Sequence, residues 1–446
     1  APQFHSQGRL PVAFPCYGRR RPLALLNETK ESGIVHEPVL VRSILEYEQA
    51  FGEADDTGDI IIEQHPDTAV YSAENKKNDM PYTPGLMHPS ISNFFSNGGG
   101  SCYIISLGTY QAFNDIVKAS DVTSEISAIE EAIKQADTAT LILPTDLMRF
   151  GAANYYAWGT ELINFCQTEK KYFTIMDVIQ SKPTSPTFEE KDISDYREHV
   201  KPDSPCYAGA YFPYLNSLST YAYKDDYSNV YLNGSKLSIA EITNELKEFL
   251  LTNYINMPPS PFIAGLYGRL DNASGVWTPP ANVSPAGVTG PVVQLTSKQQ
   301  ENLNVDATTG ISVNAIRSFT GKGTLVWGAR TNDGNSLDWR YINVRRLIIS
   351  METDINMALE SYVFKPNSYN TWVEVKTMIE SYLLGLFNDG AFAGSTADTC
   401  YNVLIGVGET MTDEDVLNGN MKVSVQIAPV RPAEFITLTF SQMVAM

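Results

Sequence analysis

Residues 319–347 read FTGKGTLVWGARTNDGNSLDWRYINVRRL, and the fold is interpreted outward from this stretch. Glycines flank the short apolar run 324–327, which is the pattern of a strand between tight turns. The segment 332–335 that follows has the composition of a turn. Apolar residues then recur at spacings of three and four, at Val344, Leu347, Ile348, Met351 and Ile355. That spacing predicts one face of an amphipathic helix.

The composition limits the class of protein. The chain has 446 residues, which is enough for two or three domains, and its hydrophobic fraction of 43% is that of an ordinary globular protein. A net charge of -19 argues against the broad basic surface of a nucleic-acid binder. No apolar run approaches the roughly 20 residues of a membrane span, and the N-terminal residues lack the apolar core of a signal peptide. We therefore expect neither nucleic-acid binding nor direct membrane insertion.

The cysteine pattern predicts free thiols. The five cysteines are odd in number, far apart and without a CxxC pair: Cys16, Cys102, Cys166, Cys206 and Cys400. Such spacing favours neither a disulfide framework nor a zinc site. Buried thiols in a protein that folds in a reducing cytoplasm are the better interpretation.

The middle of the chain alternates between strand-like and helical patterns. The strand-like runs are 102–107, 140–143, 172–179 and 206–211, and the helical patterns are 124–136 and 152–166. Apolar strands that alternate with helices predict a mostly parallel sheet covered on both faces. The polar stretch 53–84 is expected to form a loop or small surface insertion, 181–204 a loop, and 216–236 a loop or exposed hairpin.

The C-terminal part has a different pattern. A helix is expected after Asn367 or Ser368, either of which can cap it, with Trp372, Val375, Ile379, Leu383 and Leu386 on one side. Three strand-like runs follow at 401–407, 422–427 and 434–440. Helices followed by an antiparallel meander predict a separate α+β domain.

The order strand, VWGAR, turn, WRYINVRRL and helix resembles the C-terminal domain of contractile tail sheath proteins. This family forms the sheaths of contractile phages, pyocin-type particles and extracellular contractile injection systems. Further motifs occur in the family's order, with VFKPN at 363–367, DGAFAG at 389–394 and APVRPAEFI at 428–436. The run LPVAFPCYG at 10–18 resembles the family's VPAFIGY strand. The resemblance covers most of the chain and is densest from 257 to 440.

The resemblance implies a fold and a domain order. The family's middle domain is α/β with a mostly parallel sheet, described as subtilisin-like in topology and without protease function. The expected domains are an N-terminal segment 1–22, an N-terminal region with a surface insertion 23–84, a middle α/β domain 85–315, and a C-terminal α+β sheath domain 316–446 with antiparallel strands. The last is expected to face the tube and mediate polymerisation. Only residues 1–9 precede the first strand, whereas the family has a longer arm with a TPGVY motif, so the arm is either trimmed or absent.

The resemblance also implies a function. The chain is expected to be a structural subunit that polymerises helically around an inner tube and contracts to drive the tube through a target envelope. The implied partners are identical sheath subunits, the inner tube protein, baseplate and terminal cap proteins, and a paralogous sheath subunit where one co-assembles. No cofactor is implied. Assembly is expected in the bacterial cytoplasm, and the product is a phage tail or phage tail-like particle.

Arginines in the opening stretch are candidate interface residues. They are Arg330, Arg340, Arg345 and Arg346. In one interpretation they pair with acidic neighbours such as Asp333, Asp338 and Glu352, in weak surface ion pairs. In the other, some face another subunit or an acidic inner tube, because Arg suits buried interfacial pairs. The sequence leaves both open.

The end of the chain supplies a second group of interface candidates. Residues 434–440 alternate, with Ile436, Leu438 and Phe440 on one face and Phe435 on the other. Such a strand can pair with a neighbouring subunit, or it can be an ordinary meander strand within its own subunit.

Two alternatives to a contractile sheath remain. One is a hydrolase on the α/β domain, and the other is a static tube or baseplate protein. All of the histidines, His5, His36, His65, His88 and His199, lie in polar contexts typical of loops, and no Gly-x-Ser-x-Gly elbow occurs. The acidic run 413–415 is typical of solvated surface. We therefore expect no catalytic, cofactor-binding or metal site.

Overall fold

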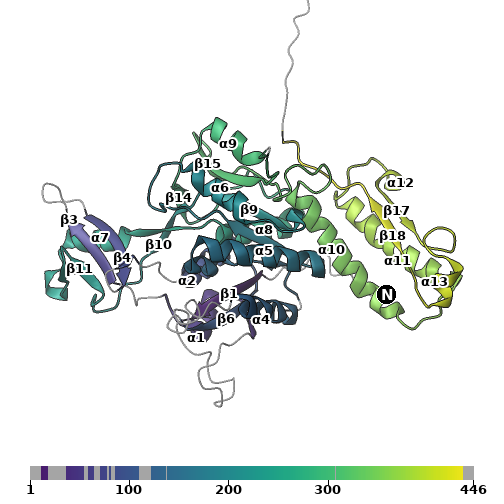
Figure 1. Cartoon of the computed structure of the whole chain (residues 1–446), viewed down its shortest axis with the longest axis horizontal. Helices are drawn as coiled ribbons and strands as arrows, with labels where there is room; N and C mark the ends of the chain where they lie inside the picture. The colour runs from purple at the N-terminus through teal and green to yellow at the C-terminus, as the bar shows by residue number, and fades with distance from the viewer. Residues whose placement is uncertain are drawn as a thin grey trace, which may run out of the picture. The chain divides into compact units, whose positions relative to one another are not determined.

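The computed structural model describes residues 12–18, 37–54, 59–64, 71–77, 80–81, 86–109, 122–136, 138–306 and 308–434 (Figure 1). These residues fall into two compact units. The larger lies within Ser6–Ser274 and Pro280–Ile342, and the smaller within Gly275–Pro279 and Asn343–Met446. The architecture is mixed α/β with several sheets. No described helix is both long and apolar enough to cross a bilayer.

The centre of the larger unit is an eight-stranded sheet in the order β16-β15-β9-β8-β7-β1-β6-β2. Its strands are β1 (Val12–Gly18), β2 (Pro38–Val41), β6 (Cys102–Thr109), β7 (Leu141–Ile142), β8 (Phe173–Asp177), β9 (Ala208–Phe212), β15 (Val313–Phe319) and β16 (Gly323–Val326). The inner pairs are parallel, and the two outer pairs, β2 with β6 and β15 with β16, are antiparallel. The alternating pattern in the sequence had predicted this mostly parallel sheet.

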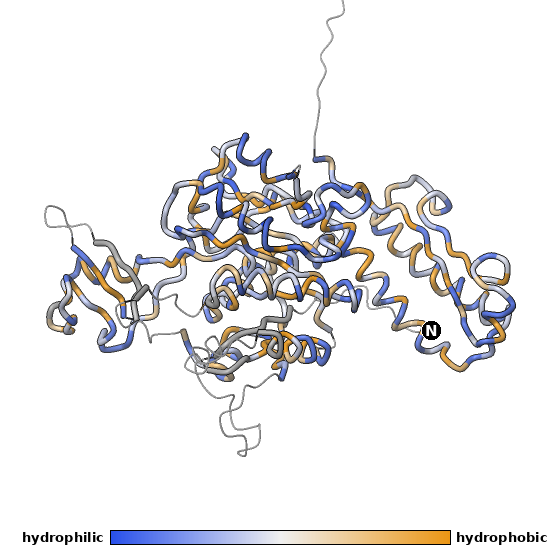
Figure 2. The backbone as a smooth tube through the Cα atoms, in the orientation of Figure 1, coloured by the Kyte–Doolittle hydropathy of each residue, from blue (hydrophilic) through white to orange (hydrophobic). Residues whose placement is uncertain are grey.

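Helices cover the sheet because its central strands are apolar on both faces. Every residue of β8 and β9 is buried, and α5 and α8 both pack against β8. The helices of this unit are α1 (Ile44–Phe51), α2 (Met87–Ser96), α4 (Val122–Gln135), α5 (Ala152–Glu169), α6 (Glu190–His199), α7 (Asn244–Thr252), α8 (Ser260–Ser274) and α9 (Ser297–Asn304). Figure 2 shows hydrophobic residues running through the central elements, while α9 is hydrophilic.

A small β-subdomain is formed by the two stretches that were predicted as a loop or small surface insertion and as a loop or exposed hairpin. Residues within 53–84 and 216–236 form strands, in the sheet order β12-β11-β3-β4-β5. Its elements are β3 (Asp59–Gln64), β4 (Tyr71–Lys77), β5 (Met80–Pro81), β11 (Val230–Leu232) and β12 (Ser235–Lys236), and α7 joins its core. Ile60 and Ile62 are buried there against Val230 and Leu246. The subdomain lies to one side of the large sheet (Figure 1).

A further sheet and a helix also replace predicted loops. The strands β10 (Leu215–Thr220), β13 (Tyr254–Met257) and β14 (Val288–Pro291) form an antiparallel sheet. Within 181–204, where a loop was predicted, α6 buries Ile193 and Tyr196 on one face. Most other residues of α6 are charged, so the sequence showed no clear helical pattern of apolar residues.

The smaller unit is α+β. It contains most of α10 (Ile342–Leu359), then α11 (Tyr369–Asn388), α12 (Ala397–Cys400), α13 (Asp413–Leu417) and the antiparallel pair β17 (Tyr401–Leu404) and β18 (Ser424–Ile427). Short 3₁₀ helices occur in the two units at Thr145–Phe150, Pro205–Tyr207, Ile239–Glu241 and Glu360–Tyr362. The core of the smaller unit packs Leu347 and Met351 of α10 with Val375, Ile379 and Leu383 of α11. These residues lie on the helix faces that the sequence predicted.

The smaller unit begins later in the chain than the predicted C-terminal domain. That domain was placed from residue 316, which lies inside β15. Because β15 pairs with β9 and with β16, residues 313–326 are hydrogen-bonded into the large sheet. Apart from Gly275–Pro279, the compact smaller unit therefore consists of residues from Asn343 onward.

Candidate functional site

Arg330 is fixed inside the larger unit. It is 5% exposed, and its Nη1 donates to the carbonyl oxygen of Asn304 at 3.2 Å. The side-chain amide of Asn314, in β15, bonds both the N–H and the carbonyl oxygen of Arg330. The Asn314 Nδ2 donates to the Arg330 carbonyl oxygen at 2.8 Å, and the Arg330 N–H donates to the Asn314 Oδ1 at 2.8 Å. Arg330 thus connects β15 with the end of α9.

Arg340 closes the predicted turn. Its Nε donates to the carbonyl oxygen of Ser336 at 2.7 Å, and its own carbonyl oxygen accepts from the Thr331 N–H at 2.8 Å. Burial raises the pKa of the Asp333 carboxyl in the same turn, while a hydrogen bond from Ser336 and the charge of Arg340 oppose that rise. Arg340 therefore stabilises the chain between β16 and α10.

Arg345 and Arg346 lie at the start of α10, and each is 4% exposed. The Nη2 of Arg345 is 3.6 Å from Oε2 of Glu352, seven residues further along the helix. This is one of the ion pairs that the first interpretation predicted. An interface role for the four arginines stays a prediction.

The predicted terminal strand lies mostly beyond the described residues. Phe435, Ile436, Leu438 and Phe440 all fall outside them. Their exchange between subunits therefore stays a prediction too.

A buried polar cluster that the sequence analysis missed joins β8, α5 and α8. Oδ1 of Asp177 accepts the backbone N–H of Ser260 at 2.8 Å, and its Oδ2 accepts the Ser260 hydroxyl at 2.5 Å. The Ser260 Oγ is also 2.7 Å from Oγ1 of Thr145, and the Asp177 N–H donates to the Tyr155 hydroxyl at 3.1 Å. The carboxyl group thus caps the first turn of α8 from the end of β8.

Burial controls the charge of this cluster. It raises the pKa of Asp177 to about 7, although the hydrogen bonds from Ser260 favour the charged form. Ser260 is completely buried, so no substrate can reach its hydroxyl. The cluster is therefore a structural cap. The visible sequence signal was an aspartate within a mainly apolar strand, but its partner is 83 residues away.

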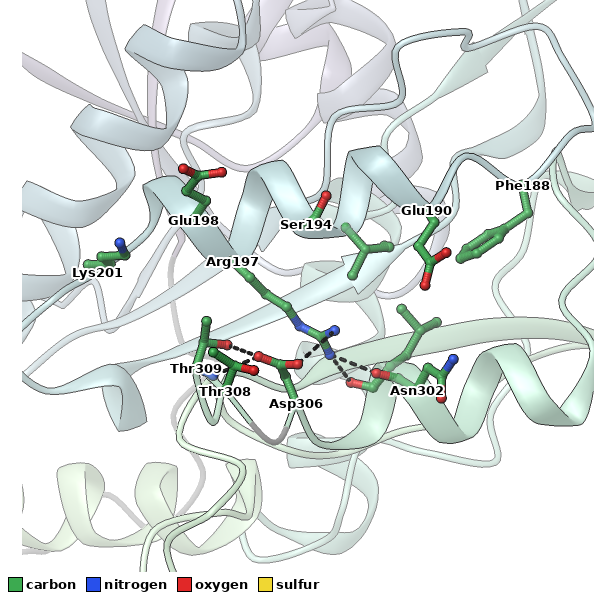
Figure 3. A pocket seen from close by; sticks show the side chains of 12 residues that line it. Phe188, Glu190, Ser194, Arg197, Glu198, Lys201, Asn302, Asp306, Thr308 and Thr309 are labelled. Carbon is green, nitrogen blue, oxygen red and sulfur yellow. Dashed lines mark hydrogen bonds and ion pairs between the residues drawn. The ribbon is translucent and has the colours of Figure 1, made fainter.

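A hollow of about 340 Å³ lies between α6 and the segment after α9, and Phe188, Ile193 and Leu303 form part of its lining (Figure 3). Arg197 extends across it. Its Nη2 donates to the carbonyl oxygens of Asn302 at 2.9 Å and Leu303 at 3.1 Å. Because these carbonyls lie in the last turn of α9, Arg197 helps to cap the C-terminus of that helix. The polar groups of the hollow thus hold the fold together.

The described histidines lie in helices, which corrects their predicted loop contexts. Nε2 of His88, in α2, is 2.9 Å from Oε1 of Glu48 in α1. Nδ1 of His199, at the end of α6, is 2.8 Å from the carbonyl oxygen of Asp195 in the same helix. The first contact joins α2 to α1, and the second lies within α6.

The acidic run 413–415 begins a helix. Thr412 and Asp415 form a capping box at the start of α13. The Nζ of Lys422 lies 2.6 Å from Oδ1 of Asp415, and this hydrogen bond is the main cause that lowers the Asp415 pKa to about 2. Within the part of the chain that the structure describes, no group of three or more His, Cys, Asp or Glu could hold a metal ion.

The described cysteines are free and buried, as predicted. They are Cys102, Cys166, Cys206 and Cys400. Burial raises the pKa of the Cys166 thiol to about 12, so it stays protonated.

Comparison with known proteins gives a family match at the C-terminal end. Residues 335–443 match the phage tail sheath C-terminal domain. The tail sheath protein of Vibrio phage KVP40 is 27% identical over 185 residues, which are 41% of this chain and 26% of that protein. The match to the tail sheath protein of Enterobacteria phage T4 covers 27% of that protein, so the chain spans about a quarter of the curated relatives it matches.

Solved structures match almost the whole chain. One is the PVC sheath complex of an extracellular contractile injection system in the contracted state, with 26% identity, a TM-score of 0.67, and coverage of 98% of this chain and 93% of that chain. Another is the helical sheath of the anti-feeding prophage in the contracted state, with 27% identity, a TM-score of 0.64, and coverage of 97% and 93%. Together with the domain match, these similarities confirm the resemblance to contractile tail sheath proteins that the sequence predicted.

Proposed function

We propose that this chain is a structural subunit of a contractile sheath. Identical copies polymerise helically around an inner tube and contract to drive the tube through a target envelope. The observation that carries this proposal is the similarity over 98% of the chain to a contracted sheath complex. The buried arginines, the helix caps and the Asp177 cluster all stabilise the subunit, which agrees with a structural role.

The mechanism rests on two packings of one folded subunit. A head-to-tail interface whose rotation does not close produces an open helical filament. The extended sheath is metastable, and contraction releases free energy that is summed over many subunits. Strand exchange through residues 434–440 keeps neighbours connected while they rotate, because main-chain hydrogen bonds persist as the linkers bend.

The proposed partners follow from this assembly. They are identical subunits, an inner tube, baseplate and terminal cap proteins, and a paralogous sheath subunit where one is present. A solved baseplate of the anti-feeding prophage, similar to this chain over 98% of its length at 27% identity, supports the baseplate contact. Assembly takes place in the bacterial cytoplasm, and the product is a phage tail or phage tail-like particle.

The two units take different places in the proposed sheath. The C-terminal region, predicted as 316–446, lies at the inner radius, mediates polymerisation and faces the tube. The middle α/β region lies outside it, with subtilisin-like topology and no catalysis. The β-subdomain around β3 and β11 lies on the outer surface of the proposed sheath. Arg330, Arg340, Arg345 and Arg346 support the inner region, and Arg340 is the one of them with appreciable exposure.

Electron microscopy of the purified assembly tests the function directly. We expect hollow cylinders in two forms, one long and narrow and one short and wide. Cylinders of a single length and diameter under all conditions would indicate a static tube. A protein that stays monomeric with and without an inner tube would contradict the proposal.

A further inference from the structure

The loop between α10 and α11 exposes an aromatic side chain completely. Phe364 has a relative exposure of 103%, and its neighbours Val363 and Tyr369 are 61% and 72% exposed. The φ angle of Phe364 is +66°, in the left-handed region. That conformation is disfavoured for a residue with a Cβ. The isolated subunit therefore carries a bulky apolar residue that is both exposed and conformationally strained.

Contacts within the smaller unit hold this loop in place. The Trp372 Nε1 donates to Oδ1 of Asn367 at 2.7 Å, and the Asn367 Nδ2 donates to the carbonyl oxygen of Asn420 at 3.1 Å. The Nζ of Lys365 lies 4.0 Å from the centre of the Tyr362 ring and 3.5 Å from Oε2 of Glu374. The side chain of Phe364 thus projects from a loop that is already fixed by these contacts. The loop therefore loses little conformational freedom when the Phe364 side chain binds a partner.

The charge of the chain points to the chemistry of the partner. Residues 361–373 contain no Asp or Glu and one Lys, in a chain with a net charge of -19. Copies of so acidic a chain repel one another at long range. A contact between them is favourable where carboxylates are missing and apolar surface is buried, and an aromatic residue is a common anchor of such a contact. The segment 361–373 itself carries no carboxylate and exposes apolar side chains, and of the two glutamates that border it, Glu360 and Glu374, the second is paired with Lys365.

We propose that Val363, Phe364 and Tyr369 form an anchor that binds an apolar recess on a neighbouring copy of this chain. The proposal rests on the proposed function, since it needs a polymer of identical subunits. In the assembled state, burial of the Phe364 ring offsets the conformational strain that the isolated subunit carries.

Phe364→Gly is the decisive variant, because glycine adopts the left-handed conformation freely. We expect its melting temperature to be equal to or higher than that of the wild type. Self-assembly of the purified chain, without any tube, should need a roughly tenfold higher concentration, as measured by sedimentation and electron microscopy. The matched control is Leu417→Ala, which removes an 86% exposed apolar side chain elsewhere in the same unit and should leave assembly unchanged.

Each other outcome overturns the proposal. Wild-type assembly by Phe364→Gly, or an equal loss in Leu417→Ala, shows that the loop is not a specific anchor. Normal self-assembly with a loss of tube binding assigns the loop to the tube. The wild type is assayed alongside, so a failure of the anchor alone is distinguishable from a failure of the proposed function. A wild type that forms no cylinders with or without an inner tube contradicts both proposals.

Discussion

Asp177 is the residue at which burial and charge conflict most directly. It lies fully buried at the end of β8 and receives its hydrogen bonds from Ser260. Its pKa is about 7 in the folded chain, against about 4 for an aspartate in an unfolded chain. The folded state therefore binds a proton more tightly than the unfolded state does. This contribution to stability is fully present below about pH 4 and is lost as the pH rises towards 7.

Asp177→Asn should remove this pH dependence. Wild-type stability should fall between pH 4.5 and 7 by on the order of 1 kcal/mol per pH unit from this group, and then level off. The variant should lack that part of the decline, because an amide does not titrate. Urea denaturation across this pH range measures it. Asp225→Asn, at an exposed position, serves as the control and should keep the wild-type profile. If Asp177→Asn follows the wild-type profile as well, the raised pKa is wrong.

The sequence was least informative about the contacts of single residues. An aspartate within a mainly apolar strand is visible, but Ser260 becomes its partner only when α8 packs on β8. The arginines give a second example. Their number and spacing are plain in the sequence, whereas the burial of Arg330 depends on Asn304 and Asn314, which come from other elements.

Among the elements, those with strong local patterns were predictable. The strand β8 is buried throughout, and α10 places Val344, Leu347 and Met351 on one buried face. The strands β3 and β11 were not predictable, because Ile60 pairs with Val230 across a long stretch of intervening chain and turn residues surround both. For strands as short as these, distant pairing decides the structure, and local pattern does not.

Two helical glycines make a matched test of the observed packing. A Cβ added to Gly385, inside α11, would meet no atom within 4 Å, whereas at Gly265, inside α8, it would lie 2.5 Å from the Phe94 carbonyl oxygen. Gly385→Ala should therefore stabilise the subunit by about 0.5–1 kcal/mol, since alanine favours helix. Gly265→Ala should destabilise it by about 1–3 kcal/mol through overpacking. Urea denaturation of the unassembled subunit measures both changes. Equal effects at the two positions would contradict the packing described for α8 and α11.

At the scale of the whole molecule, we predict that the end of the chain connects neighbouring subunits in the proposed sheath. The alternation in 434–440 predicts a half-buried strand, and Pro429 and Pro432 precede it. A free strand edge promotes aggregation in an isolated protein. In a polymer the same edge can receive a strand from a neighbour, and contraction can then proceed without loss of connection.

Leu438→Pro separates exchange between subunits from pairing within one subunit. Proline removes a backbone donor and resists strand geometry, whereas the control Leu438→Val keeps both the donor and the β propensity. Under exchange, the proline variant should melt near the wild-type temperature yet form no cylinders in electron micrographs. Under internal pairing, its melting temperature should fall, because the strand is then part of the subunit's own core. A proline variant that builds normal contractile sheaths would rule out both arrangements, and the connection between subunits would then have to lie elsewhere in the chain.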